Sequence, residues 1–418
     1  MGRKLKHFPI LLLLLLSCYL AAAARIRSPS DAGAIADLAR SLSRPPSTWT
    51  AAGGGDVCSF KGITCSDVGR VTAIDLAGEG LAGTLPSSLS NLTNLVSLQL
   101  HGNALTGAIP PLRLSSLTDL SLEGNSFTSL PVDFPRGTPA LRSLTMDNLP
   151  LPPWPFPAAI FECPYLRTFS ASNTSLTGAF PAAGIVSNLK SIATLRLAHN
   201  NLTGVIPEVL GQIVSLGEIS LSYNHFQGPV PVFHISVAVD DMVAGNGFCL
   251  DKPGQPCDSQ VSALLEVAGG FGYPVNLSRS WTGNDPCNGW VGVECDISEV
   301  AILGLTSYNL SGIISPAIAD LTGLTTLNLA NNHLTGEIPD GLAGLPKLTL
   351  VDVRNNRLTG KLPKFKESVD VLVDGNDPSL RSQHGQGSLT GGSSSSKSSS
   401  AGTILGIVLG VLVFCKDN

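Results

Sequence analysis

The chain has 418 residues, of which 14% are charged and 43% are hydrophobic, with 44 glycines and 29 prolines. A charged fraction well below the usual quarter, together with so much glycine and proline, is typical of many short elements joined by turns. The net charge of -5 and the lack of a long lysine and arginine run exclude nucleic acid as an expected partner.

The first segment, residues 1–24, has the layout of a cleavable secretion signal. Arg3, Lys4 and Lys6 precede an apolar run, and small alanines follow it up to Ala24. Because that run is short for a spanning helix, we expect cleavage near Ala24 rather than a retained membrane anchor. The rest of the chain should therefore be exported.

Residues 25–70 form a non-repeating start. A stretch with helically spaced apolar residues is followed by Trp49, and then by Cys58 and Cys65 around the core SFKGIT. This order of helix, tryptophan and two cysteines recurs later in the chain, after the first set of repeats described next.

A repeat of about 24 residues begins at Val71. The stretch from Leu324, LTTLNLANNHLTGEIPDGLAGLPK, shows its pattern, LxxLxLxxNxLxGxIPxxLxxLxx. Equivalent starts, 22–26 residues apart in a first set and 24 apart in a second, are Val71, Leu95, Leu117, Leu141, Leu166, Ile192 and Leu216, then Val300, Leu324 and Leu348. Self-similarity at such a period predicts a solenoid.

Each part of the repeat has a physical role. Residues one, four and six point inward from a short strand, and those between them face outward. The asparagine at position nine can bond the neighbouring turn and so form a ladder; it stands at Asn103, Asn125, Asn200, Asn224, Asn332 and Asn356. One unit cannot bury its apolar edge alone, so we predict an α/β solenoid with a parallel short-strand sheet on its concave face. The units at Leu117 and Leu141 depart from the pattern in their turns and should bulge or bend the array.

The stretch between the two sets of repeats reads as an end followed by a new start. After a frayed unit closed by Cys249 and Cys257, the opening order returns with Trp281, Cys287 and Cys295. Because the ends of a solenoid need covering segments, we predict two capped blocks separated by a non-repeat insertion. The predicted segments are a cap at 25–70, seven repeats with a frayed end at 71–257, a second cap at 258–299, and three repeats with an end cap at 300–378.

The last segments are polar and then apolar. Residues 379–402 are rich in serine and glycine and read as a flexible linker. The apolar run at 403–415 has 13 residues, against the ~20 that a spanning helix needs. We therefore expect a truncated transmembrane segment with a cytoplasmic remnant at 416–418. A glycolipid-anchor signal is the alternative, which Lys416 and Asp417 fit poorly.

The cysteines of the exported part occur mostly in close pairs. An oxidising compartment would make these pairs disulfides, namely Cys58 with Cys65, Cys249 with Cys257, and Cys287 with Cys295. Zinc is the rival interpretation, but no histidine stands at a ligand spacing, so we expect no metal and no cofactor. Cys163 is left over, and its state stays open.

The LxGxIP ending resembles the plant-specific leucine-rich repeat, and both cysteine-bearing starts resemble the N-terminal cap of such proteins. The order of two capped blocks, an insertion holding GNDPCNGWVGVEC, a Ser/Gly spacer and an apolar segment resembles the ectodomain of plant transmembrane-kinase (TMK) receptor-like kinases. The resemblance implies a place in the plasma membrane, a cytoplasmic Ser/Thr kinase in family members, and a role in growth or auxin signalling. No kinase motif occurs in this sequence, so we expect no enzyme activity.

The concave face is the expected binding surface of a solenoid. Outward strand positions there are candidate contacts for an extracellular protein, peptide or small-molecule ligand, or for a co-receptor: Arg142, Arg196, His199, Tyr223, Asn328, Asp352 and Arg354. For any single one, solvated surface is the alternative. The RxR pair with which some plant peptide receptors hold a carboxylate does not occur on these strands.

Five sequons are candidate glycosylation sites in an exported chain: Asn91, Asn173, Asn201, Asn276 and Asn309. Asn173 falls at an outward strand position. A glycan there would screen the concave face around the fifth repeat and shift binding toward the second block or the insertion.

Together these features predict the extracellular recognition part of a receptor-like kinase at the plasma membrane. The alternatives are a secreted, kinase-free protein that acts as a decoy for its relatives, or an inhibitor of cell-wall-degrading enzymes, since such inhibitors use the same repeat.

Overall fold

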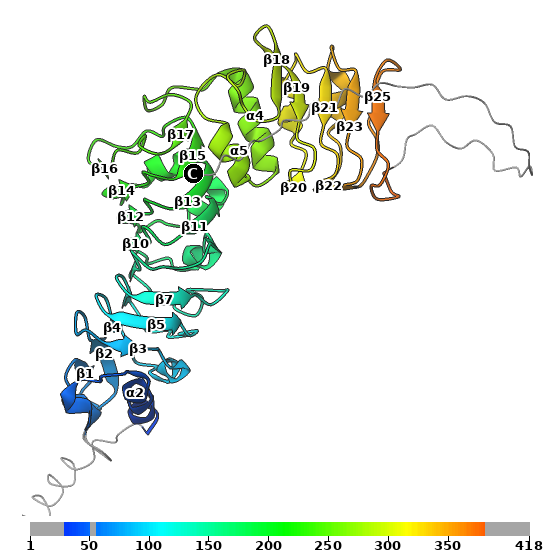
Figure 1. The fold of residues 1–418 in the computed structure, drawn as a ribbon. Coiled ribbons are helices and arrows are strands. Elements are labelled where there is room, and N and C mark those ends of the chain that lie inside the picture. The colour runs from blue at the N-terminus through cyan, green and yellow to red at the C-terminus, as the bar shows by residue number, and fades with distance from the viewer. Residues whose placement is uncertain (1–28, 51–55, 381–418) are drawn as a thin grey trace, which may run out of the picture. The chain divides into compact units, whose positions relative to one another are not determined.

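The computed structural model describes residues 29–50 and 56–380 (Figure 1). These residues form two stacks of repeats, each around its own hydrophobic core. The predicted secretion signal at 1–24, nearly all of the predicted linker, the segment at 403–415 and the remnant at 416–418 lie outside the described residues.

The first block is built on a nine-stranded sheet. Its first two strands pair antiparallel, and every later pair is parallel with equivalent residues side by side. Along the sheet the strands are β1 (Ile63–Cys65), β2 (Val71–Asp75), β4 (Ser97–Gln99), β6 (Asp119–Ser121), β8 (Ser143–Thr145), β10 (Thr168–Ser170), β12 (Thr194–Arg196), β14 (Glu218–Ser220) and β16 (Ala238–Val239). Since each repeat supplies one strand, its inward leucines stack on those of the next repeat, as predicted.

The turns that follow these strands add a second set of short strands in two sheets. They are β3 (Ala82–Gly83), β5 (Ala104–Ala108) and β7 (Ser126–Ser129), then β9 (Trp154–Pro155), β11 (Leu176–Ala179), β13 (Asn201–Val205), β15 (His225–Gly228) and β17 (Gly247–Phe248). The break between β7 and β9 falls in the two repeats that depart from the sequence pattern. There the β5–β7 register shifts by one residue, and the proline-rich stretch 150–157 offers few N–H donors to continue a ladder.

The second block repeats this arrangement on a smaller scale. A five-stranded sheet contains β18 (Val293–Asp296), β19 (Glu299–Gly304), β21 (Thr326–Asn328), β23 (Leu350–Asp352) and β25 (Asp370–Leu372), and a three-stranded sheet contains β20 (Ser311–Ile313), β22 (His333–Gly336) and β24 (Arg357–Leu358). As in the first block, only the first pair, β18 with β19, is antiparallel.

Short helical turns connect the strands. The proline of the IP pair, or of the LP pair at Pro86, stands just before several of them, where its extended backbone ends the strand and its missing N–H is not needed. They are η1 (Ser47–Thr50), η2 (Val57–Ser59), η3 (Ser87–Asn91), η4 (Ala158–Glu162), α3 (Ala183–Val186), η5 (Glu208–Gln212), η6 (Pro316–Asp320) and η7 (Asp340–Gly344).

The predicted asparagine ladder is present in both blocks. Asn332, for example, accepts from the backbone N–H of Leu310 at 3.0 Å and donates to the carbonyl of Leu329 at 2.9 Å. Asn246 and Asn376 continue the ladder into the frayed last unit of each block, each accepting a backbone N–H at 2.9 Å. Buried turns between repeats thus keep their hydrogen bonds without water.

Three helices belong to the caps: α2 (Pro29–Ser41) precedes the first block, and α4 (Ser259–Gly270) and α5 (Val275–Ser280) precede the second. Asp258 caps α4 by accepting from the N–H groups of Gln260 and Val261. Helix α4 lies against η6 of the second block and, like α5, also contacts β13 and β15 of the first. The insertion is therefore packed against both blocks.

Candidate binding surface

The strand face consists of the outward side chains of the nine-stranded and five-stranded sheets. Several of the predicted binding residues on this face are already paired with neighbouring residues. The guanidinium of Arg196 donates to both oxygens of Glu218 at 2.7 Å, and this bond raises the pKa of Arg196. Arg354 donates to Asp352 at 3.0 and 2.6 Å. That bond lowers the pKa of Asp352, which is only 5% exposed. These pairs neutralise each other's charge and offer little to a ligand.

Other polar residues of the face are tied across repeats. Asn328 accepts from the hydroxyl of Thr306 at 2.8 Å and from its own turn, the N–H of Ala330, at 3.2 Å. Three carboxylates each accept a hydroxyl from a nearby strand, and these bonds run from Thr145 to Glu123 (2.6 Å), from Ser170 to Asp147 (2.6 Å) and from Ser220 to Asp240 (2.8 Å). This network stiffens the face and leaves these carboxylates satisfied.

Arg142 is exposed, and its side chain makes no hydrogen bond or ion pair with the described residues. The same holds for Arg167, which lies beside it on the next repeat, with its N–H donating to the Arg142 carbonyl at 2.7 Å. Two unpaired like charges at equivalent positions just before neighbouring strands repel each other. Two guanidinium groups on adjacent repeats can also bind one carboxylate or sulfate group between them.

His199 and Tyr223 form the most unusual feature of the face. Their rings stack in parallel with centroids 4.4 Å apart, and both residues have positive φ, 56° and 54°. The equivalent position in other repeats holds glycine, asparagine or serine: Gly78, Gly102, Gly124, Asn148, Asn173, Ser307, Asn331 and Asn355. A bulky side chain in the left-handed region costs roughly 1–2 kcal/mol, so two exposed aromatic rings here are not explained by folding alone. The sequence alone could have shown this feature, because aligning the repeats reveals that only His199 and Tyr223 are aromatic at the eighth position.

The five sequon asparagines differ in their surroundings. Asn91, Asn173, Asn276 and Asn309 are exposed. Asn173 donates to the side chain of Asn148 at 3.1 Å and lies in the same row as His199 and Tyr223. Asn201 instead is half-buried in the contact between the first block and the insertion. It is therefore less accessible to a glycan than the other four.

That contact is polar as well as apolar. The side-chain oxygen of Asn201 lies 3.0 Å from the ring nitrogen Nε2 of His225 and 3.4 Å from Arg279, whose Nε also donates toward the same His225 nitrogen at 3.3 Å. Burial, and then the charge of Arg279, lower the pKa of His225. Nearby, the buried amide of Gln227 donates to the carbonyl of Trp281 at 2.6 Å. The sequence indicates Asn201 as a sequon and Trp281 as part of the second cap, but it does not predict this contact, because the residues meet only once the insertion has folded onto β13 and β15.

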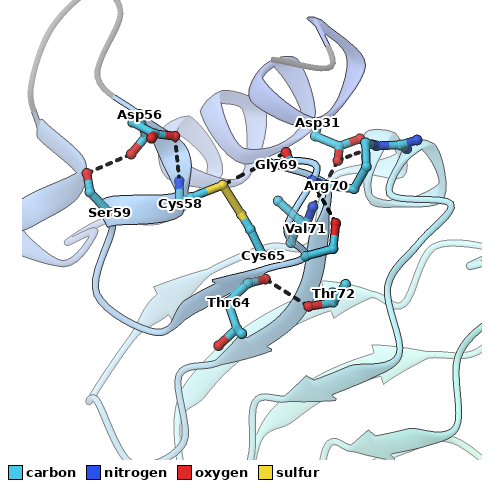
Figure 2. Close-up of a disulfide and its surroundings, with 11 residues drawn as sticks. Asp31, Asp56, Cys58, Ser59, Thr64, Cys65, Gly69, Arg70, Val71 and Thr72 are labelled. Carbon is cyan, nitrogen blue, oxygen red and sulfur yellow. Dashed lines mark hydrogen bonds and ion pairs between the residues drawn. A yellow bond between two sulfur atoms is a disulfide. The ribbon is translucent and has the colours of Figure 1, made fainter. Parts of the chain in front are cut away.

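The first cap is closed by the Cys58–Cys65 disulfide (Figure 2). Figure 2 shows Asp56 accepting from the N–H of Cys58, and Asp31 of helix α2 paired with Arg70 beyond the disulfide. The carboxylate of Asp31 is 1% exposed and also accepts from the first backbone N–H of the first repeat. The bonds of Asp31 hold α2 against the first repeat, and the disulfide closes the loop between η2 and β1.

The other two predicted pairs are also bonded, Cys249 with Cys257 and Cys287 with Cys295. Cys163 is buried and forms no disulfide with another cysteine of the described part of the chain. Burial raises the pKa of its thiol to about 11, with the charge of Glu162 adding to the effect, so the thiol is protonated at physiological pH. Among the described residues no cluster of histidine, cysteine and acidic side chains could hold a metal ion.

Within residues 29–50 and 56–380, none of the helices combines the length and the apolar character required to cross a bilayer.

Comparison with known proteins agrees with the repeats and caps. A family model described as "Leucine rich repeat N-terminal domain" matches residues 28–66 and 257–296, and models described as "Leucine rich repeat" match 298–358 and 191–213. The two matches of the first model fall on the two caps. The predicted fold class, a leucine-rich-repeat solenoid, is confirmed.

Relatives align along most of the chain. Receptor protein kinase WSS1 of Oryza sativa subsp. japonica is 46% identical, over 90% of this chain and 49% of that protein. Receptor-like kinase TMK4 of Arabidopsis thaliana is 34% identical, over 76% of this chain and 41% of that protein. The chain thus spans half or less of the length of these curated relatives. Among solved structures, the crystal structure of PEPR1–AtPEP1 covers 83% of this chain at 24% identity, with a TM-score of 0.45, and 52% of that chain is covered.

The caps, the two blocks of repeats and the alignment with WSS1 and TMK4 along most of this chain lead to one assignment. The chain belongs, as a leucine-rich-repeat ectodomain, to the plant receptor kinases of the TMK type.

Proposed function

We propose that this chain is the extracellular recognition part of a plant receptor-like kinase at the plasma membrane. In this proposal it binds an extracellular ligand or co-receptor, in growth or auxin-related signalling, and catalyses no reaction. The similarity to WSS1 and TMK4 supports the family context. The observation that carries the proposal is the His199–Tyr223 stack, which is exposed on the strand face at a cost in backbone strain.

The side chains of the strand face that have no charged partner form two groups, one of arginines and one of aromatic rings. Arg142 and Arg167 stand just before β8 and β10, while His199 and Tyr223 stand just after β12 and β14. The two arginines hold position two of their repeats and the two aromatic residues hold position eight, six residues further along, which corresponds to about 20 Å at 3.3 Å per residue. The small side chain of Ala198 and the satisfied carboxylate of Asp147 lie in this interval. A peptide that carries a carboxylate at one end and an apolar or aromatic group at the other fits such a surface.

The experiment compares what the immobilised chain captures from plant extracellular fluid, identified by mass spectrometry, between wild type and two double variants. His199→Gly with Tyr223→Gly removes the stack and relieves the positive φ, so it should lower ligand capture at least tenfold without lowering the melting temperature. Arg142→Ala with Arg167→Ala should lower capture by a similar factor. Arg357→Ala, exposed on β24 and away from this face, is the matched control and should change nothing.

Identical captured sets for wild type and both double variants would contradict this use of the strand face. Inhibition of a polygalacturonase by the purified chain, unchanged in the variants, would instead support the inhibitor function considered from the sequence.

A further inference from the structure

The turn between β18 and β19 in the second cap contains a backbone anomaly. Asp296 pairs with Glu299 across the hairpin, which leaves a two-residue turn of Ile297 and Ser298. Ile297 has φ of 59°, and Ser298 does not share the positive sign. A two-residue hairpin with positive φ at its first central residue alone is the type in which glycine is expected. A β-branched residue is strained there.

The corresponding hairpin of the first cap has no β-branched residue with positive φ. This hairpin, between β1 and β2, is longer and places its positive φ of 74° on Gly69. Its apolar residue, Val68, therefore keeps negative φ. The second cap could have used glycine as well, yet it places an isoleucine there whose side chain is 98% exposed. An exposed side chain makes no contact that could offset the strain within this chain, so packing does not explain it.

The strand next to this turn has an outer edge that is open beyond its first residue, Val293, whose N–H donates to the carbonyl of Trp290 at 3.0 Å. β18 is the outermost strand of the five-stranded sheet and pairs only with β19 among the described residues. An unpaired strand edge is a template for another extended chain. Glu294 and Asp296 point to the same side of β18 because they are two residues apart, and both are exposed.

The charge of this edge decides which chain fits. Glu299 is paired with Lys347 at 2.6 Å, and the charge of Asp296 also acts on that lysine. Glu294 forms no ion pair or hydrogen bond through its side chain with the residues that the structure describes, so this edge stays net negative. A second copy of this chain pairing through β18 would place these carboxylates opposite each other, which is unfavourable. Lysine or arginine residues at alternate positions of an added strand would instead lie opposite Glu294 and Asp296.

We infer that the β18 edge docks an extended, basic segment of another extracellular protein, which adds a strand beside β18 and covers Ile297 with an apolar residue. This surface belongs to the insertion and is separate from the strand face of the first block. It does not depend on the ligand proposed for that face. Strand addition provides the backbone hydrogen bonds, and the alternate basic residues provide the selectivity.

The test uses the purified chain and fluorescent ten-residue peptides followed by anisotropy. One peptide alternates lysine and valine, a second has glutamate for lysine, and a third has proline at the alternate valines, which removes N–H donors. We expect the basic peptide to bind about tenfold more tightly than the other two, the size that two reversed charge pairs or a lost ladder would give. Glu294→Lys with Asp296→Lys should reverse the preference between the first two peptides.

Ile297→Gly separates the docking role from a structural one. If the isoleucine serves the fold, the variant should melt at a lower temperature; if it serves docking, it should melt at the same or a higher temperature and bind the basic peptide at least threefold more weakly. Val68→Gly in the first cap is the matched control and should leave peptide binding unchanged. Equal binding of the three peptides, a lower melting temperature of Ile297→Gly, or dimerisation of the chain that Ile297→Gly abolishes would each overturn the inference.

Discussion

The cap before the first block and the cap before the second hold their first repeats in the same way. In each, a tryptophan indole donates at 2.9 Å to a carbonyl in the cysteine loop, from Trp49 to Lys61 and from Trp281 to Val291. Each indole ring also stacks on the aromatic residue of that loop. The tryptophan therefore holds the cysteine loop in the same way at both starts.

Even the first backbone N–H of each block has a matching acceptor. The N–H of Val71 donates to Asp31 at 3.0 Å, and that of Val300 donates to the amide oxygen of Gln260 at 2.7 Å. The first cap uses a carboxylate, which is then paired with Arg70, where the second uses a neutral amide. The first N–H of a block therefore requires a hydrogen-bond acceptor from the cap helix, and this acceptor can be charged or neutral.

The two caps differ in what lies behind them. Only the second also contacts a preceding block, through Gln227 with Trp281, through Arg279 with His225, and through the ring of Tyr273 against Gly204. A cap becomes a joint between two blocks when its outer surface gains such contacts. If the second cap both covers its own block and joins it to the first, substitutions in it should affect both blocks.

The largest effect should come from Trp281→Ala. The residue is 1% exposed, and its loss should cost about 3–5 kcal/mol of the free energy of unfolding. Because its carbonyl also accepts from Gln227, we expect scanning calorimetry to show the transitions of the two blocks moving apart. Trp49→Ala should cost a similar amount but act only on the first repeats, since solenoid units depend on their neighbours. Equal calorimetric profiles for the two variants would contradict the double role of the second cap.

Gly312→Ala should follow in size. Gly312 has φ of 91°, and a Cβ there would collide with the carbonyl of Gly270 at the end of α4. Strain and overlap together should cost about 2–4 kcal/mol. Gly336, at the same position of the next repeat, has φ of 76°, but a Cβ there would meet a side-chain methyl group of Ile313 at 3.1 Å and no backbone atom, so Gly336→Ala is the matched control and should cost less. Urea unfolding of both variants measures the difference.

Much of this organisation follows from the sequence alone. The period of the leucines and asparagines determines which residues point inward, and the repeated order of tryptophan and cysteines marks both caps. Inward positions are predictable because burial permits only apolar residues or a satisfied asparagine there.

The outward positions are less predictable, since several partners are sterically possible for each. Arg196 could have faced solvent, but it reaches Glu218 on the next strand. Asp352 occupies an outward position, yet Arg354 covers it. The contact of Gln227 with Trp281 joins residues 54 apart, outside the reach of a pattern with a 24-residue period.

Gly204→Ala tests the joint more directly. Gly204 has φ of 80°, and a Cβ there would lie 2.6 Å from the ring of Tyr273. Gly178 occupies the same position in the preceding repeat, with φ of 90° and open space around it. Both substitutions introduce the same backbone strain, so the additional loss of stability in Gly204→Ala, about 1–2 kcal/mol, measures the packing of the insertion on the first block. Equal losses would mean that the ring moves aside without cost.

The smallest effect concerns pH and His225. A neutral ring uses Nε2 either to accept from Arg279 or to donate to Asn201, whereas a protonated ring would repel Arg279. The pKa of His225 is therefore lowered in the folded chain, by burial first and by Arg279 second. The unfolded chain then takes up this proton at a higher pH than the folded chain. The stability of the joint should be fully present above about pH 6.5, the ordinary histidine value, and decrease as the pH falls through the lowered pKa.

His225→Gln keeps a donor for Asn201 and removes the titration. Its melting temperature should change less between pH 7.5 and 5 than that of the wild type, and His333→Gln, exposed on β22 in the second block, should behave as the wild type does. Among residues 29–50 and 56–380, no histidine lies at the contacts of the first cap. A pH-dependent shift that His225→Gln removes would therefore mean that acid loosens the second cap from the first block, while its hold on the second block persists. A wild-type pH dependence retained in His225→Gln would assign that loosening to other groups and leave the joint insensitive to pH.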